Sequence, residues 1–161
     1  MITGKEKFIQ LILHPVKFRL FLFAKLPSAF FSGLKVQSLD ISKAVVTVPY
    51  KWFSKNPFKS TYFACLAMAA ELSTGLLAMM NTYQADPPIS MLVTGLEAKY
   101  FKKATGKTSF FCEEGDSFHR TVLAAISTGE GQVFTAKSIG KNEAGELVAE
   151  FLITWSFKVK K

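Results

Sequence analysis

The sequence predicts an α+β protein in which a curved antiparallel sheet wraps around one long central helix. Residues 60–80 form a long apolar run with helical spacing and a single carboxylate, Glu71. Most of the segments around this run instead alternate with period two. The last segment, 147–159, keeps its apolar residues on one face along its whole length. Such a strand indicates an antiparallel sheet with one side packed on a helix.

The chain has the length and composition of one folded domain. It has 161 residues, of which 49% are hydrophobic, and it contains 16 Phe. A domain of this size buries about two-thirds of the surface that its unfolded chain exposes. This composition excludes a disordered chain. We therefore expect a single domain over residues 1–161.

The first 31 residues predict an interrupted helical segment. Apolar residues recur there at three- or four-residue spacing, Pro15 restarts the helix, and Pro27 ends it. Because the segment is basic and aromatic, it fits either a helix covering one side of the domain or a weak contact with a membrane surface. Charged residues interrupt the apolar run and no small-residue cleavage site follows. We therefore expect no secretory signal.

The other elements are predicted from the places where the apolar spacing changes between the helical repeat and the two-residue repeat of a strand. The order is a helical segment, two strands, the central helix, and four strands with a short helical insert. The expected strands are 34–39, 44–50, 89–101, 108–112, 132–139 and 147–159, and the short helix is 116–127, with Asp116 as its N-cap.

The central helix is nearly long enough to span a bilayer, so a membrane span is an alternative interpretation. A carboxylate at the centre of a span costs about 2.5–3.5 kcal/mol on insertion scales. The segments after this helix also alternate like the strands of a soluble sheet. We therefore expect a buried central helix.

The charge of the chain indicates an anionic partner. The formal net charge of +8 fits a CoA-type substrate, an acidic membrane surface or nucleic acid. The basic residues are spread over the chain without the signature of a nucleic-acid module, so we expect no nucleic-acid partner. Cys65 and Cys112 are too few for a disulfide scaffold, which favours a cytoplasmic protein. No metal-ligand spacing occurs, and we expect neither a metal nor a cofactor.

Glu71 is the residue that most suggests a function. On a helical repeat it lies in a stripe of small residues, which would let a backbone or a slender ligand approach. A lone carboxylate facing such a stripe is costly to bury unless it has partners or a task. The small residues of the stripe are Ser60, Ala64, Ala67, Thr74, Gly75 and Ala78.

Several short segments of the sequence resemble those of a known family. They are residues 27–34, 48–52, 56–58, 62–64 and 69–75. With the order of elements, these segments resemble the hotdog-fold thioesterase superfamily. Within it the chain looks like a bacterial branch catalogued as a domain of unknown function and related to phenylacetate-type acyl-CoA thioesterases. The resemblance extends over nearly the whole chain.

The resemblance implies hydrolysis of an acyl-CoA or acyl-carrier thioester. Such thioesterases have an Asn before the helix, a His-Gly-Gly at its start, and an acidic residue about two turns into it. Asn56 and Glu71 stand at the first and last of these positions. The resemblance makes Glu71 the base or nucleophile and Asn56 the residue that orients the attacking water. It also implies a homodimer, or a tetramer, with the site between two subunits.

The chain departs from this pattern at the start of the helix, where Tyr62, Phe63 and Ala64 replace His-Gly-Gly. We expect the N–H groups of Phe63 and Ala64 to hold the carbonyl oxygen, and Tyr62 to supply a hydroxyl. Thr74, on the stripe of small residues, is expected to line the substrate site. The departure favours the main alternative, a non-catalytic acyl-binding protein.

Glu71 and Asn56 each also have a purely structural alternative. In that alternative, Glu71 only accepts hydrogen bonds from a neighbouring strand or from a partner subunit. Asn56 likewise only forms part of a turn.

Overall fold

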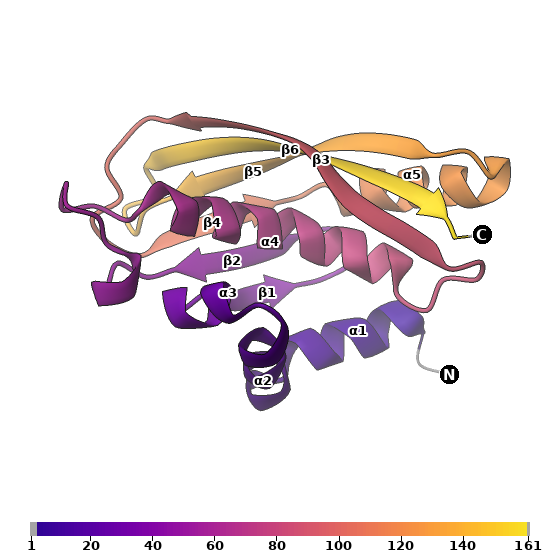
Figure 1. Cartoon of the computed structure of the whole chain (residues 1–161), viewed down its shortest axis with the longest axis horizontal. Coiled ribbons are helices and arrows are strands. Elements are labelled where there is room, and N and C mark those ends of the chain that lie inside the picture. Colours follow the sequence, from indigo (N-terminus) through magenta and orange to yellow (C-terminus); the bar gives the residue numbers. More distant parts are fainter. Residues whose placement is uncertain (1–2, 161) are drawn as a thin grey trace.

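The computed structural model describes residues 3–160, and it has one long helix inside a curved six-stranded antiparallel sheet (Figure 1). The strand order is β1-β2-β4-β5-β6-β3. The α+β arrangement expected from the sequence is therefore confirmed. The strands are β1 (Lys35–Leu39), β2 (Ala44–Val48), β3 (Ile89–Tyr100), β4 (Thr108–Cys112), β5 (Gln132–Lys141) and β6 (Leu147–Val159).

The last strand, β6, organises the sheet. It pairs with β5 along one edge and with β3 along the other, antiparallel in both cases. Its apolar face is almost fully buried, as the alternation predicted. The residues of that face include Phe151, Ile153, Trp155 and Phe157. The outer edge of β3 pairs with no other strand within residues 3–160.

The helix inside the sheet is α4 (Phe63–Thr82). It begins three residues later than predicted because Tyr62 is extended and serves as the N-cap, which leaves Ser60 and Thr61 in the preceding loop. Within residues 3–160, α4 alone is long and apolar enough to span a membrane. However, 67% of its apolar window is buried inside the protein. This burial fits the central helix that the sequence predicted.

Three helices, rather than one interrupted helix, form the N-terminal segment. They are α1 (Gly4–Leu13), α2 (Pro15–Lys25) and α3 (Pro27–Ser32), and they gather beside α4 and β1 (Figure 1). Pro15 begins α2, as predicted. The expectation that Pro27 ends the helical segment is wrong, because Pro27 begins α3. Proline fits a first helical position, where no N–H is needed.

Two further elements complete the fold. α5 (Gly115–Thr128) packs on α4, β5 and β6, close to the predicted range. Its N-cap is Glu114, and Asp116 lies in the first turn instead of capping the helix. The 3-10 helix η1 (Trp52–Ser54) was not predicted and lies in the loop between β2 and α4. Pro49 follows β2 directly, which explains why that strand stops before Tyr50.

Candidate functional site

Glu71 lies in the middle of α4 and is its only acidic residue. It borders a small hollow of about 170 Å³ that α4 shares with the junction between α2 and α3. Within residues 3–160 its carboxylate has no hydrogen bond and no ion pair, and Lys25 at the rim of the hollow is not close enough to pair with it. Burial raises the pKa of this carboxyl above its usual range.

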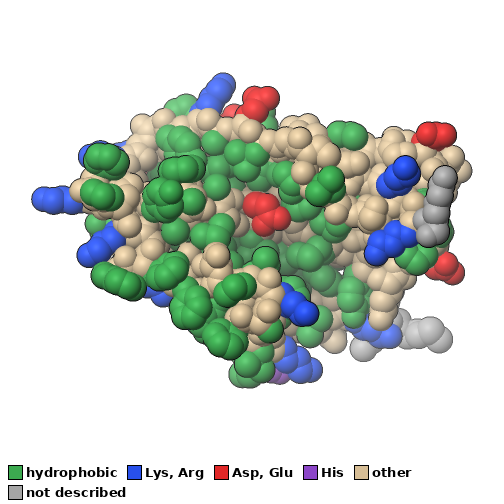
Figure 2. Space-filling model, in the orientation of Figure 1, with side chains coloured by type: hydrophobic (Ala, Val, Ile, Leu, Met, Phe, Trp, Pro, Cys, Tyr) green, Lys and Arg blue, Asp and Glu red, His purple; other side chains and the backbone are tan. Residues whose placement is uncertain are grey.

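The surroundings of the Glu71 carboxylate are apolar. The hollow is walled mainly by Leu26, Pro27, Met68 and Leu72. Figure 2 shows this face of the molecule, where an acidic side chain over α4 is surrounded mostly by hydrophobic ones. A carboxyl in such a place holds its proton more tightly than one in water. When it ionises, no cation among residues 3–160 pairs with its charge.

Gly75 creates the space in which this carboxylate lies. A Cβ added at Gly75 would lie 3.2 Å from Glu71 Oε1 and 3.3 Å from the ring of Trp155. The carboxylate and the indole therefore both approach the helix where a side chain is missing. Trp155 is almost fully buried, and it forms an apolar wall beside the carboxylate.

Thr74 faces the sheet instead of the hollow. Its hydroxyl donates to the carbonyl of Glu71 at 2.9 Å and accepts a hydrogen bond from Trp155 Nε1 at 3.0 Å. The Thr74 side chain is fully buried, and so is Ala78. The predicted stripe of small residues is therefore only partly correct, because the curved sheet covers this side of α4. A contact between Thr74 and substrate stays a prediction.

Asn56 organises the loop before α4. Its Oδ1 accepts hydrogen bonds from the N–H groups of Phe58 and Ser60 and from the Ser60 hydroxyl, at 3.0–3.2 Å. Its side-chain amide donates no hydrogen bond within residues 3–160 and is therefore left to bind a ligand or a water. The turn role considered as an alternative is present, and the role in orienting water stays a prediction.

The start of α4 offers unused hydrogen-bond donors. Phe63 and Ala64 occupy the first two helical positions, and the N-cap Tyr62 makes no side-chain hydrogen bond to them. Within residues 3–160 neither N–H group has an acceptor. Tyr62 and Phe63 are exposed, and their rings meet edge to face with centroids 4.9 Å apart. A second hollow of about 580 Å³ lies here and includes Asn56.

The predicted site residues therefore fall into two groups within one chain. Asn56, Tyr62 and Phe63 line the hollow at the start of α4, and Ala64 lies next to them, half-buried. Glu71 lies seven to eight residues further along the helix, a distance of about 10–12 Å at 1.5 Å per residue. A base and the donors for an oxyanion must both lie about 3 Å from the reacting group. One chain does not bring these groups together.

Comparison with known proteins identifies the family. Residues 17–157 match the family described as "Domain of unknown function (DUF4442)". The match covers well over half of the chain. The protein belongs to this family. None of the curated proteins matches the chain.

Solved structures share the fold at low sequence identity. A Pseudomonas aeruginosa protein of unknown function, PA5026, named a probable thioesterase, is 18% identical and has a TM-score of 0.76, over 93% of this chain and 99% of that one. A Chlorobaculum tepidum protein of unknown function is 16% identical with a TM-score of 0.78, over 99% and 98%. The Haemophilus influenzae thioesterase HI1161 is 12% identical with a TM-score of 0.63, over 88% and 90%. The chain therefore has the expected hotdog fold.

The sequence analysis missed the contribution of the N-terminal helices to the surroundings of Glu71. Lys25, Leu26 and Pro27 lie more than 40 residues before Glu71 in the chain, yet they line its hollow. The sequence contained one indication of this contribution, because residues 27–34 are among the segments that resemble the family. Its position beside α4 could not be read from periodicity.

Proposed function

We propose that this protein hydrolyses acyl thioesters, with Glu71 as the base or nucleophile. The observation that supports this most is the carboxylate itself, which lies on an apolar face and has no partner among residues 3–160. A buried charge without a structural partner is costly, and active sites are where such groups are common. The thioesterase names of two structural neighbours agree with this function.

In the base mechanism, the ionised Glu71 accepts a proton from a water that attacks the carbonyl carbon of the thioester. The carbon–sulfur bond then breaks, and the proton passes from Glu71 to the leaving thiolate. Burial raises the pKa of Glu71, which makes its carboxylate a stronger base toward the water. The protonated carboxyl can still return its proton, because a thiolate is a stronger base than a carboxylate. Because Asn56 of the same chain lines the other hollow, the amide that orients the water would come from Asn56 of a second copy of the chain.

We propose that the complete site forms between two copies of the chain. The free edge of β3 would pair with β3 of a second copy about a two-fold axis, which sets the two α4 helices antiparallel. The unused N–H groups of the partner's Phe63 and Ala64 would then approach Glu71 from the other side. This assembly supplies the oxyanion donors that lie too far away within one chain.

The substrates that fit are acyl-CoA or acyl-carrier thioesters. The hollow at the start of α4 combines aromatic residues with Lys103, which suit an acyl chain and a phosphate-bearing carrier. Lys102 also lines it but is paired with Glu146 at 2.7 Å. Cys65 and Cys112 are both buried free thiols, which suits a reducing cytoplasm.

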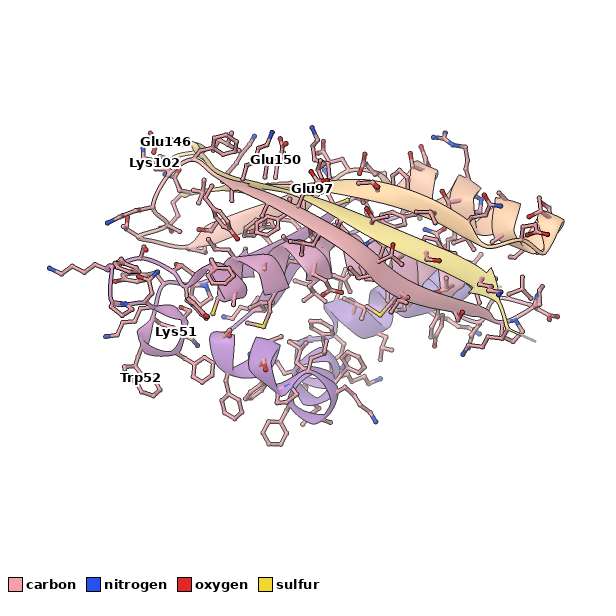
Figure 3. All side chains as sticks on the ribbon, turned by 45° about the horizontal axis from the view of Figure 1, so that its top comes forward. Lys51, Trp52, Glu97, Lys102, Glu146 and Glu150 are labelled. Carbon is pink, nitrogen blue, oxygen red and sulfur yellow. The ribbon has the colours of Figure 1, made fainter. Side chains whose placement is uncertain are left out.

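A second candidate contact is an anionic membrane surface. Six exposed apolar side chains lie on α2, α3 and η1, in segments that also carry Lys17, Arg19, Lys25 and Lys51. They are Val16, Leu20, Phe23, Phe31, Trp52 and Phe53. Trp52 is 80% exposed and lies beside Lys51 at one end of the molecule (Figure 3). Aromatic side chains among lysines suit the headgroup region of an acidic bilayer.

The test is thiol release from a panel of acyl-CoA substrates by the wild type and by Glu71→Gln. We expect turnover by the wild type and a loss of about a hundredfold or more in the variant, the scale of general-base catalysis. Glu130→Gln removes an exposed carboxylate in the loop after α5 and should leave turnover unchanged.

Three results would each contradict a part of the proposal. Full turnover in a folded Glu71→Gln protein would remove Glu71 from the mechanism. Tight acyl-CoA binding without turnover across the panel would instead establish the non-catalytic acyl-binding alternative. A monomer in light scattering would exclude the shared site.

A further inference from the structure

A larger hollow lies at the opposite edge of the sheet from β3, and it contains none of the candidate catalytic residues. Its volume is about 770 Å³, and it lies between α1, α2 and the strands β1 and β2. We call it the N-terminal groove. Its size falls within the range of about 300–1,000 Å³ that is typical of small-molecule sites.

The floor of the N-terminal groove is apolar and fixed. Ile12, Phe18 and Leu34 belong to the hydrophobic core, and Val36 packs against that core. Side chains held in this way keep their positions without a ligand, so little order is lost when an apolar chain binds. Each methylene that leaves water for such a floor contributes about 0.8 kcal/mol.

All the charged residues at the rim of the groove are basic. Four cations line it, namely Arg19, Lys35, Lys51 and Lys107, and no acidic residue does. Of these four cations, only Lys107 has a carboxylate partner among the described residues, Glu143 at 3.7 Å, and that pair is exposed. Four like charges around one hollow repel each other, and a bound anion would relieve this repulsion.

Two of these cations are held at the groove by their surroundings. Gly33, with φ of +78°, ends α3, and a Cβ added there would lie 2.5 Å from Lys51 Nζ. The ammonium group therefore occupies space that only glycine leaves open. The Arg19 guanidinium lies 4.0 Å from the centre of the Phe30 ring, which orients it while its N–H groups stay available.

We propose that the N-terminal groove binds a single-chain amphiphile with an anionic head. The hydrocarbon chain would lie on the floor formed by Ile12, Phe18 and Val36, beneath which Leu34 is fully buried. The head, a carboxylate or a phosphate, would lie among the four cations. The proposal does not depend on thioester hydrolysis, because it uses neither Glu71 nor the start of α4.

Calorimetry on the full chain tests the chemistry of the ligand. The probes are laurate and dodecyl phosphate, each below its micelle concentration, with dodecanol as the uncharged chain and inorganic phosphate as the head without a chain. We expect both amphiphiles to bind at one per chain, and dodecanol and phosphate to bind about tenfold or more weakly, as expected when a charge-assisted contact or the apolar chain is removed. The two amphiphiles also show which head is preferred.

A pair of double variants tests the location. Lys35→Glu with Lys51→Glu reverses two charges at the groove and should weaken laurate binding about tenfold or more. Lys43→Glu with Lys158→Glu makes the same change in net charge at exposed positions that do not line the groove, and should leave binding unchanged. Equal affinity in both double variants, or equal affinity for dodecanol and laurate, would overturn the proposal.

Photolabelling of the wild type gives an answer even if a variant fails to fold. A laurate carrying a diazirine at its chain end should label residues 12–19 and 33–36, as found by peptide mass spectrometry. Labelling confined to residues 56–72 would place the amphiphile at the candidate catalytic site and would overturn the assignment to the N-terminal groove.

Discussion

The helices α4 and α2 are both rich in apolar residues on every side, yet they differ in how much of their surface is buried. The curved sheet encloses α4, and Leu76 on it is fully buried. Only one side of α2 is covered: Leu22 is fully buried, whereas Leu20 is 63% exposed and Phe23 55%. Hydrophobicity along a helix therefore does not by itself determine burial. Burial depends on whether the sheet extends far enough to cover the helix.

Each helix also has one feature that runs against its surroundings. On α4 the exception is the charge of Glu71 in an apolar setting. On α2 it is an apolar stripe, Val16, Leu20 and Phe23, in contact with water. Both features are unfavourable for an isolated chain, which is why we assign the first to catalysis and the second to a membrane surface.

The largest expected effect comes from truncating matched leucines on the two helices. Leu76→Ala on α4 should lower the free energy of unfolding by about 2–5 kcal/mol, because it leaves a cavity in the core. Leu20→Ala on α2 should change it by less than about 0.5 kcal/mol. Urea unfolding followed by circular dichroism measures both. Equal losses would mean that another surface already covers the outer side of α2.

A smaller effect is expected where the sheet is fastened to α4. Thr74→Val keeps the shape but leaves Trp155 Nε1 without its acceptor, which should cost about 1–3 kcal/mol. Trp155 emission, recorded in a Trp52→Phe background so that one tryptophan remains, should change as well. An unchanged midpoint and spectrum would show that this hydrogen bond does not fasten the sheet to the helix.

The stripe on α2 should govern attachment to membranes more than stability. Leu20→Ser with Phe23→Ser should reduce flotation with phosphatidylserine vesicles by about tenfold or more, since each buried apolar side chain contributes about 1.5–3 kcal/mol. Thermal melting should barely change. Leu92→Ser, an exposed leucine on β3, is the control and should float as the wild type does. Unchanged flotation of the double variant would refute the membrane contact.

The smallest expected effect is a pH dependence of stability at Glu71. Burial raises the pKa of this carboxyl in the folded state, so the folded protein holds the proton more tightly than the unfolded chain. As pH rises above the unfolded pKa, the unfolded state ionises first and stability falls, until the pH passes the folded pKa. Melting temperatures of wild type and Glu71→Gln should therefore agree in acid and separate toward neutral pH, with the variant higher. Parallel curves would show that the folded carboxyl is not perturbed.

Periodicity sufficed for the elements whose two faces differ in polarity. The range of β6 was predicted to the residue because its apolar face lies against the core and its polar face does not. The start of α4 was predicted less exactly. A helix that is apolar on every side has no change of pattern in its sequence to mark where the preceding loop ends and the helix begins. The family resemblance supplied the hotdog fold, and the comparisons confirm it.

The candidate site was only partly accessible to the same reasoning. Glu71 was identifiable because a charge interrupts an apolar helix. The direction of Thr74 was not, since small residues on one helical stripe look alike whether they face a ligand or the ring of Trp155. The N-terminal groove was also invisible in the sequence, because its cations come from four separate segments that only the fold brings together.

The position of β6 in the sheet has a consequence for synthesis on the ribosome. β3 is made some 60 residues before β6, yet β6 is its partner within the sheet. Until residues 147–159 leave the exit tunnel, both edges of β3 are open and the sheet around α4 is incomplete. After β3 has left the ribosome and before β6 follows, the nascent chain therefore exposes an apolar helix and an unpaired strand, which chaperones bind.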